Sequence, residues 1–84
     1  MKSCFFERDG VRLHALECGT APADIPMIII PGATTNAQEI ADDFSAAFSH
    51  LHYVLDMRGK GQSDVPTTGY SVESLAADVW AFMQ

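Results

Sequence analysis

Basic residues are scarce in this chain, which has five Lys and Arg against eleven Asp and Glu and a formal net charge of −6. Only Arg58 and Lys60 lie close together, so no cluster of cations is available to neutralise phosphates, and we expect no nucleic-acid partner. Long apolar runs are also missing. No stretch approaches the roughly 20 residues of a membrane span, and the N-terminus lacks the apolar core of a signal peptide. We therefore expect a cytoplasmic protein with no membrane partner.

Cysteine is equally rare. The two cysteines, Cys4 and Cys18, belong to no C-x-x-C or Cys/His cluster. Asp9-Gly10 is a strong signal for a two-residue hairpin turn, and in that register Cys4 faces Ala15. Cys18 then lies too far from Cys4 for a disulfide. The sequence predicts two buried, reduced thiols.

Histidines number three, and none is spaced from another histidine or an acid as zinc ligands on one element are. His14 falls in a predicted hairpin strand, and His50 and His52 flank the start of a later strand. We expect surface or edge histidines, no metal site and no general base among them.

What the sequence does contain is an ordered series of elements, with no repeat or low-complexity tract, so residues 1–84 form a single unit. Residues 4–8 and 11–18 flank the hairpin turn. Met27–Pro31 is an unbroken apolar run, which is typical of a parallel strand covered by helices on both faces. Helical spacing follows over 36–48, started by a capping box of Thr35 with Gln38 or of Asn36 with Glu39.

A second parallel strand is predicted over 51–56, because strand-helix-strand units cross over right-handedly. Residues 71–84 read as a helix with Ser71 as N-cap and Glu73 in its first turn. Its apolar stripe is Val72, Leu75, Ala76, Val79 and Met83. The fold class is therefore α/β. A helix after a parallel strand normally leads to another strand, so we expect a piece of a longer domain, whose remainder covers the open sheet edge.

Asp56-Met57-Arg58-Gly59-Lys60-Gly61-Gln62-Ser63, a D-x-R-G-x-G-x-S stretch directly after a strand, demands tight glycine turns. With the preceding hairpin, apolar strand and Pro-Gly loop, it resembles the N-terminal part of the α/β-hydrolase fold. Within that fold it is most similar to small cofactor-independent hydrolases, including epoxide hydrolases, C–C hydrolases and amidases.

The resemblance implies sheet order 1-2-4-3 and a site at the loop after Met27–Pro31. That loop supplies one N–H group of an oxyanion hole. By position Ala33 is the backbone donor and Gly32 permits close approach. Pro31 stands where the family usually has His, which leaves the Ala33 donor intact. The nucleophile, His and acid would be encoded downstream, with no cofactor and no G-x-S-x-G elbow in these residues.

The resemblance also offers Thr34 and Arg58 as candidates for substrate binding, since an Arg fork matches a carboxylate. For Arg58 a loop-bracing ion pair, with Asp56 or Asp64, is the favoured interpretation. Ser63 is expected to bond its own turn rather than act as a nucleophile.

The implied function is hydrolysis of an ester, amide or activated C–C bond in a small molecule. The stretches "IIIPGATT" and "YVLDMRGKGQSD" look most like N-formylmaleamate deformylase-like amidases. Two alternatives remain open. A nucleotide-binding domain would need G-x-x-x-x-G-K-[ST] or G-x-G-x-x-G, and neither pattern is present. A non-catalytic interaction domain would use the apolar residues Trp80, Phe82 and Met83 as its surface.

Overall fold

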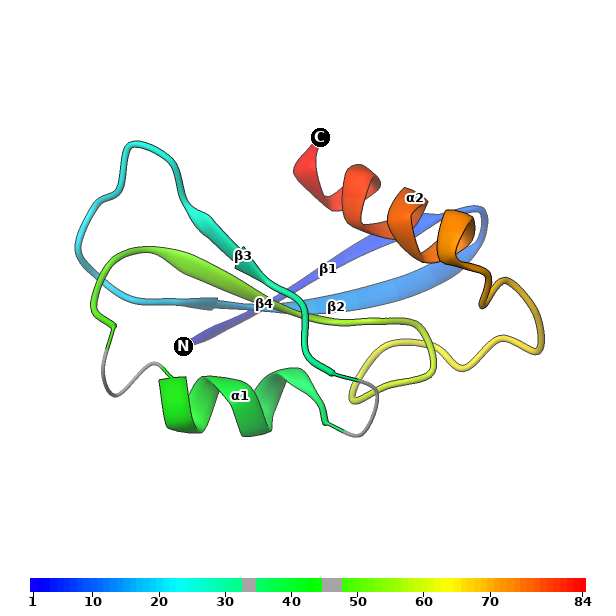
Figure 1. Cartoon of the computed structure of the whole chain (residues 1–84), viewed down its shortest axis with the longest axis horizontal. Coiled ribbons are helices and arrows are strands. Elements are labelled where there is room, and N and C mark those ends of the chain that lie inside the picture. The colour runs from blue at the N-terminus through cyan, green and yellow to red at the C-terminus, as the bar shows by residue number, and fades with distance from the viewer. Residues whose placement is uncertain (33–34, 45–47) are drawn as a thin grey trace.

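The computed structural model describes residues 1–32, 35–44 and 48–84. Four strands form one mixed sheet in the order β1-β2-β4-β3, and one helix lies on each side of it (Figure 1). The strands are β1 Lys2–Arg8, β2 Val11–Cys18, β3 Met27–Ile29 and β4 His52–Asp56, and the helices are α1 Ala37–Phe44 and α2 Val72–Met83. The α/β class and the strand order predicted from the sequence are confirmed.

The β1–β2 hairpin has the predicted register. Arg8 pairs with Val11 and Cys4 pairs with Ala15 across an antiparallel ladder. Asp9 and Gly10 both have positive φ, 51° and 80°, as a two-residue turn that matches the strand twist requires. Both cysteines are free, as predicted, although Cys4 is only half-buried because β1 is an edge strand.

Strand β4 lies between the hairpin and β3. It pairs with β2 antiparallel and with β3 parallel, with Ile29 opposite Val54. The parallel pairing is as predicted, but β3 ends at Ile29 rather than Pro31. The prediction that both faces of this strand are buried is also wrong for these residues. Ile30 is 52% exposed, because β3 forms the open edge of the described sheet.

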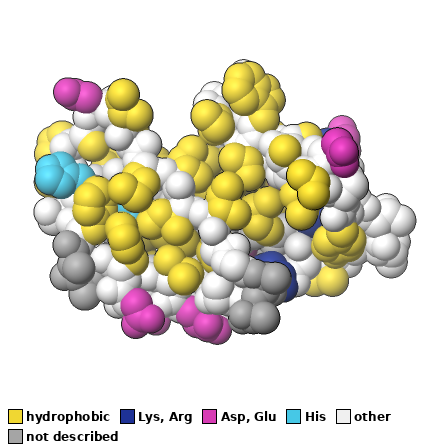
Figure 2. All heavy atoms as spheres, in the orientation of Figure 1, with side chains coloured by type: hydrophobic (Ala, Val, Ile, Leu, Met, Phe, Trp, Pro, Cys, Tyr) yellow, Lys and Arg dark blue, Asp and Glu magenta, His cyan; other side chains and the backbone are white. Residues whose placement is uncertain are grey.

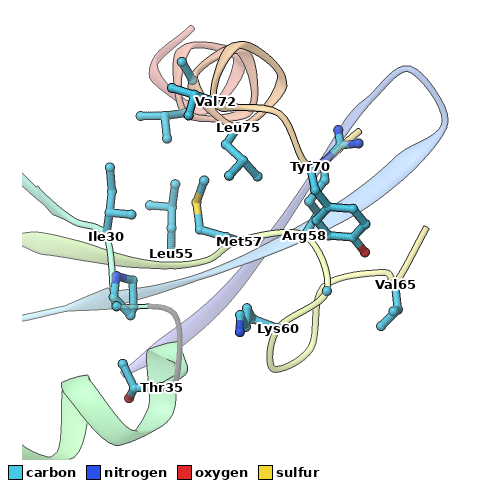
Figure 3. Close-up of a pocket in the computed structure, with 15 residues that line it drawn as sticks. Ile30, Thr35, Leu55, Met57, Arg58, Lys60, Val65, Tyr70, Val72 and Leu75 are labelled. Carbon is cyan, nitrogen blue, oxygen red and sulfur yellow. The ribbon is translucent and has the colours of Figure 1, made fainter. Parts of the chain in front are cut away.

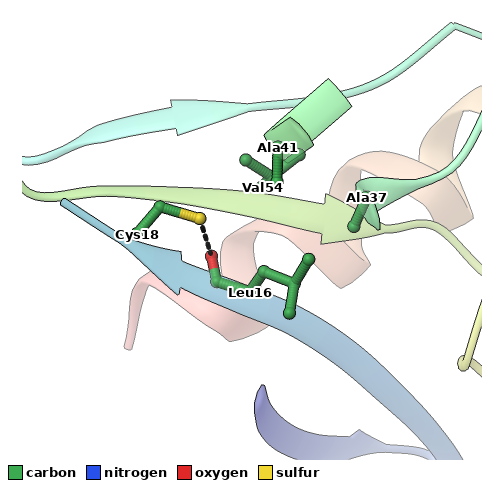
Figure 4. Close-up of a cluster of buried hydrophobic side chains, with 5 residues drawn as sticks. All are labelled: Leu16, Cys18, Ala37, Ala41 and Val54. Atoms are coloured by element: carbon green, nitrogen blue, oxygen red, sulfur yellow. Dashed lines mark hydrogen bonds between the residues drawn. The ribbon is translucent and has the colours of Figure 1, made fainter. Parts of the chain in front are cut away.

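Helix α1 packs against β2 and β4 through small side chains. Its amphipathic sequence buries Ala37 and Ala41 completely. With the inward residues of β2 and β4 they form a cluster of Leu16, Cys18, Ala37, Ala41 and Val54 (Figure 4). The Asn36 side chain caps the helix by accepting the Glu39 N–H at 3.0 Å, which selects the second of the two predicted caps. The helix is described to Phe44, and Phe48 is not helical, so the predicted end at 48 was too late.

Helix α2 lies on the opposite face, next to β1. Ser71 is its N-cap, as predicted, and accepts the Ser74 N–H. Phe82 packs on the rings of Phe6 and Tyr53. The apolar stripe predicted for this helix lies beside a groove. Four of its five members line this groove: Val72, Leu75, Ala76 and Val79.

Figure 2 shows hydrophobic side chains gathered across the centre of the face that carries β3 and α2. Acidic side chains lie along the lower edge of that view, where α1 runs in Figure 1. No helix among the described residues has the length and apolar character that crossing a membrane requires.

Candidate functional site

The main cleft lies where β3 and β4 end and runs along α2 (Figure 3). Its volume is about 570 Å³. Leu55 of β4, with Ile30 just after β3 and Met57 just after β4, faces Val72 and Leu75 of the helix. Pro31, Gly32 and Thr35 from the loop after β3 form one end of the lining, with Arg58, Gly59 and Lys60 after β4. The carboxyl ends of parallel strands are the usual ligand site of open α/β sheets, so this cleft is the candidate site.

Asp56, the last residue of β4, holds this end of the sheet together. One carboxylate oxygen accepts the Ala37 N–H at 2.7 Å, at the start of α1. The other accepts the Gln62 N–H at 3.1 Å and lies 2.7 Å from His14 Nδ1 on β2. The carboxylate has four lone-pair sites, so it can satisfy all three donors. Asp56 therefore ties the loop after β3 to β2 and to the turn after β4.

The turn after β4 is fixed by the remaining polar residues of the D-x-R-G-x-G-x-S stretch. Ser63 Oγ donates to the Asp56 carbonyl at 2.6 Å and accepts the His14 N–H at 2.9 Å. The expected bond within its own turn is thus present, with an additional bond to β2. Gly61 has φ 47° and lies against the Asp56 carboxylate, where a Cβ atom would collide. Only glycine fits there.

Arg58 forms the ion pair that the sequence predicted, but with a different partner. Its Nε and one terminal nitrogen donate to the two carboxylate oxygens of Asp78 at 2.7 and 2.8 Å. Asp78 also accepts from Arg8 Nε at 2.6 Å. Asp56 and Asp64, the partners expected from the sequence, are bonded elsewhere, Asp64 to the backbone of Arg12. A fork-to-fork pair of this kind is geometrically specific.

These contacts set the protonation of the buried pair. The hydrogen bond to Asp78 raises the pKa of the Arg58 guanidinium above its ordinary value, although burial opposes this. Burial pushes the pKa of Asp78 upward, but hydrogen bonds from Arg58 and Arg8 outweigh it and leave the pKa below its ordinary value. Both groups are therefore charged at neutral pH, which fixes α2 against the hairpin and the loop after β4.

The structure places the predicted site residues in different ways. Gly32 lies at the cleft, with open space beside its Cα, and its carbonyl accepts the Thr35 N–H at 3.3 Å. Arg58 lines the cleft while its guanidinium is paired with Asp78. Ala33, the expected oxyanion donor, and Thr34 lie outside the described residues. Among residues 1–32, 35–44 and 48–84, no group of three His, Cys, Asp or Glu side chains is placed to hold a metal ion.

Two of the three histidines are not at the surface, contrary to the sequence-based expectation. His14 is 1% exposed, because β2 is an interior strand and its ring lies on the α1 side of the sheet. His52 is fully buried, with its ring against those of Phe44 and Phe48. His50 is exposed, as expected.

Sequence reasoning missed Asp78 and the partnership of His14 with Asp56. A signal existed for Asp78, a lone acid between Ala77 and Val79 in the middle of an apolar helix. A buried carboxylate needs a paired cation, so such a residue indicates a hidden ion pair. The His14–Asp56 contact joins residues 42 positions apart and has no local signal.

Several solved structures are similar to this chain. The chain is 33% identical to Est816, an N-acyl homoserine lactone degrading enzyme, with TM-score 0.72, over 95% of this chain and 30% of that one. It is 28% identical to the enol-lactonase from Burkholderia xenovorans LB400, with TM-score 0.77, over 95% and 32%. It is 26% identical to E-2-(acetamidomethylene)succinate hydrolase, with TM-score 0.72, over 98% and 30%. No family model matches the chain, and no curated protein sequence does.

The chain thus spans about a third or less of the length of these structures. All three have the α/β-hydrolase fold, and the part that they share with this chain is the hairpin, the parallel strand pair and the two helices. From its strand order and these likenesses, the chain has the fold of the N-terminal part of α/β-hydrolases.

Proposed function

We propose that this chain is the oxyanion-hole portion of a hydrolase acting on an ester, amide or activated C–C bond in a small molecule. The observation that carries the proposal is the placement of the loop after β3. Of its described residues, Pro31 and Gly32 line the cleft, and Ala37, just after the loop, donates its N–H to Asp56. Stabilisation of a developing oxyanion requires a backbone N–H donor held near the reacting carbonyl, and the position of this loop at the cleft supports that role.

In this proposal the Ala33 N–H is one donor to the oxyanion, and Gly32 leaves room for the substrate beside it. Thr34 and Arg58 are secondary candidates for substrate contacts. Arg58 is paired with Asp78, so in this proposal it shapes the wall of the cleft. Its remaining terminal nitrogen, which donates to the Thr68 carbonyl, is the one that a substrate carboxylate would compete for. The nucleophile, its His and its acid lie outside these residues, and no cofactor takes part.

Two of the similar structures support a choice of substrate class. One of the similar structures is a hydrolase of E-2-(acetamidomethylene)succinate, and another is an N-acyl homoserine lactone degrading enzyme. The first supports an amide bond in a small acid, and the second supports a lactone or an N-acyl bond. We propose an N-formyl or N-acetamido acid. Full-length protein should hydrolyse such amides faster than simple p-nitrophenyl esters. Ester hydrolysis without amide hydrolysis would contradict this choice of substrate.

The oxyanion role is tested in the full-length enzyme by Ala33→Pro, which deletes the N–H group. Loss of one oxyanion donor lowers turnover by about a hundredfold or more. The control is Ala23→Pro, in a loop that already contains Pro22 and Pro26, for which turnover should be unchanged. Unchanged turnover in a folded Ala33→Pro variant would show that other groups hold the oxyanion.

The 84 residues alone should show no ester or amide turnover, because the elbow that carries a nucleophile is absent from the sequence. The alternative function is a non-catalytic interaction domain, for which the exposed Trp80 and Met83 side chains on α2 are the candidate surface. The reading frame after Gln84 separates the two. A G-x-S-x-G or G-x-C-x-G stretch shortly downstream supports the hydrolase, and its absence supports the interaction domain.

A further inference from the structure

Ser3, His14 and Asp56 form a chain of hydrogen bonds across β1, β2 and β4. His14 Nδ1 lies 2.7 Å from Asp56 Oδ2, and His14 Nε2 lies 3.0 Å from Ser3 Oγ. All three side chains lie on the α1 side of the sheet. A serine, an imidazole and a carboxylate in this order are the elements of a nucleophile with its base and its orienting acid.

The direction of the bonds follows from the donors available. The Asp56 carboxylate only accepts, and it already accepts the Ala37 and Gln62 N–H groups, so the proton of a neutral His14 ring lies on Nδ1. Nε2 then carries the lone pair and accepts from the Ser3 hydroxyl. The imidazole is therefore in the tautomer that can remove the Ser3 proton.

The hydrogen-bonded side chains differ in burial as a nucleophilic site requires, because the base is buried and the nucleophile is exposed. His14 is 1% exposed and its ring is held by Asp56 and by the Phe5 ring at 4.9 Å, so it has a fixed orientation. Ser3, in contrast, is exposed on the edge strand β1. The edge strand also offers a contact surface for a small molecule, a shallow hollow lined by Phe5, Phe6, Glu7 and Arg12. The Arg12 guanidinium lies 3.9 Å from the centre of the Phe5 ring and remains exposed.

We propose that Ser3, with His14 as base and Asp56 as orienting acid, is a nucleophilic site that small activated acyl compounds modify covalently. Aryl esters with an anionic group fit best, because the Phe5 ring lies two residues along β1 from the serine and the exposed Arg12 guanidinium lies over that ring. The Ser3 oxygen attacks the carbonyl carbon, and its proton passes to His14 Nε2. The aryl oxygen leaves with the bonding electron pair and takes up one proton, so that the products are an O-acyl serine and a phenol.

This modification is a single event for each chain. It is therefore compatible with the absence of turnover proposed above, and it does not depend on the Ala33 loop. Failure of the Ser3 site leaves the proposed hydrolase function untouched, and failure of the Ala33→Pro test leaves the Ser3 site untouched.

The test is labelling of the 84-residue chain with diisopropyl fluorophosphate, followed by peptide mapping in a mass spectrometer. The Ser3 oxygen displaces fluoride from phosphorus, and the hydroxyl proton leaves with the fluoride. We expect the adduct at Ser3 to form about a hundredfold faster in the folded chain than in the urea-unfolded chain, as general-base assistance provides. Acetylation by 4-acetoxybenzoate should map to the same residue.

Three variants complete the test. Ser3→Ala should lose the adduct, whereas Ser49→Ala, which removes an exposed serine outside the site, should keep it. His14→Gln should lower the rate to that of the unfolded chain while circular dichroism confirms its fold. Equal rates in folded and unfolded wild type, or rapid labelling of folded His14→Gln, would overturn the proposal. If His14→Gln does not fold, the folded-to-unfolded ratio of the wild type decides alone.

Discussion

The two faces of the sheet are packed by different means. On the α1 face, Ala37 and Ala41 pack directly on Leu16 and Val54 in a buried apolar cluster. On the α2 face, Asp78 joins Arg8 and Arg58, and the apolar stripe of the helix borders an open cleft. Close packing leaves no freedom to adjust, whereas an ion pair fixes position and leaves apolar surface available. The first face is built as a core, and the second holds a helix beside a binding cleft.

The largest expected change in unfolding free energy comes from the ion pairs of Asp78 on the α2 face. Asp78→Ala leaves the buried Arg58 guanidinium without its partner, and breaking such a pair by removing one side costs about 3–5 kcal/mol of unfolding free energy. Urea unfolding followed by circular dichroism measures it. Glu73→Ala, at an exposed acid on the same helix, should change stability by less than about 0.5 kcal/mol. A loss below about 1 kcal/mol for Asp78→Ala would mean that apolar contacts alone hold α2.

The next effect probes the closed face. Ala41→Leu adds three carbon atoms where no space exists and should cost about 1–3 kcal/mol. The matched control is Ala76→Leu, the same change on the exposed cleft side of α2, which should be close to neutral. Equal losses at the two positions would remove the distinction between the faces.

The helix caps should respond alike on both faces. Ser71→Ala and Asn36→Ala each remove the side-chain acceptor of a first-turn N–H group, at a cost of about 1 kcal/mol. The two variants measured side by side sharpen the comparison, because they separate local helix stability from packing. A clearly larger loss for Asn36→Ala would show that its bonds also support the loop after β3.

The smallest expected effect is on how the unfolding free energy changes at acid pH. A carboxyl whose pKa is lowered by folding contributes stability that is complete above its unfolded pKa, about 4, and lost as the pH falls through the folded value. Asp78 is such a group. Arg8→Gln removes one of the donors that lower its pKa, so the acid-induced loss should begin at higher pH than in wild type. Arg12→Gln, at an exposed cation that does not contact Asp78, should leave the pH dependence unchanged. Unfolding free energies from pH 5 to pH 2 measure both.

Local features of the sequence were enough to predict the hairpin and the parallel strand pair, whereas the strand order was predicted from the resemblance to α/β-hydrolases. The Asp9-Gly10 turn determines the hairpin register, and the short crossover determines that β3 and β4 are parallel. Burial was predicted less well, since it depends on neighbours distant in the sequence. His14 reads as an edge histidine until β4 is seen to cover the other side of β2. Arg58 was paired with acids nearby in the sequence, whereas its partner lies 20 residues away on a helix. The sequence could predict the candidate site only as the loop after β3, because the residues that hold the site together come from four elements that are distant in the sequence.

The strand order also governs what happens while the chain is being made. β1 and β2 can pair as soon as both have left the ribosome, but β3 emerges before β4, the strand with which it pairs. At ~5–20 residues per second, β4 follows after roughly 1–5 s. During that interval the apolar segment Met27-Ile28-Ile29-Ile30 is an unpaired strand on a nascent chain, which makes it the segment most exposed to premature aggregation.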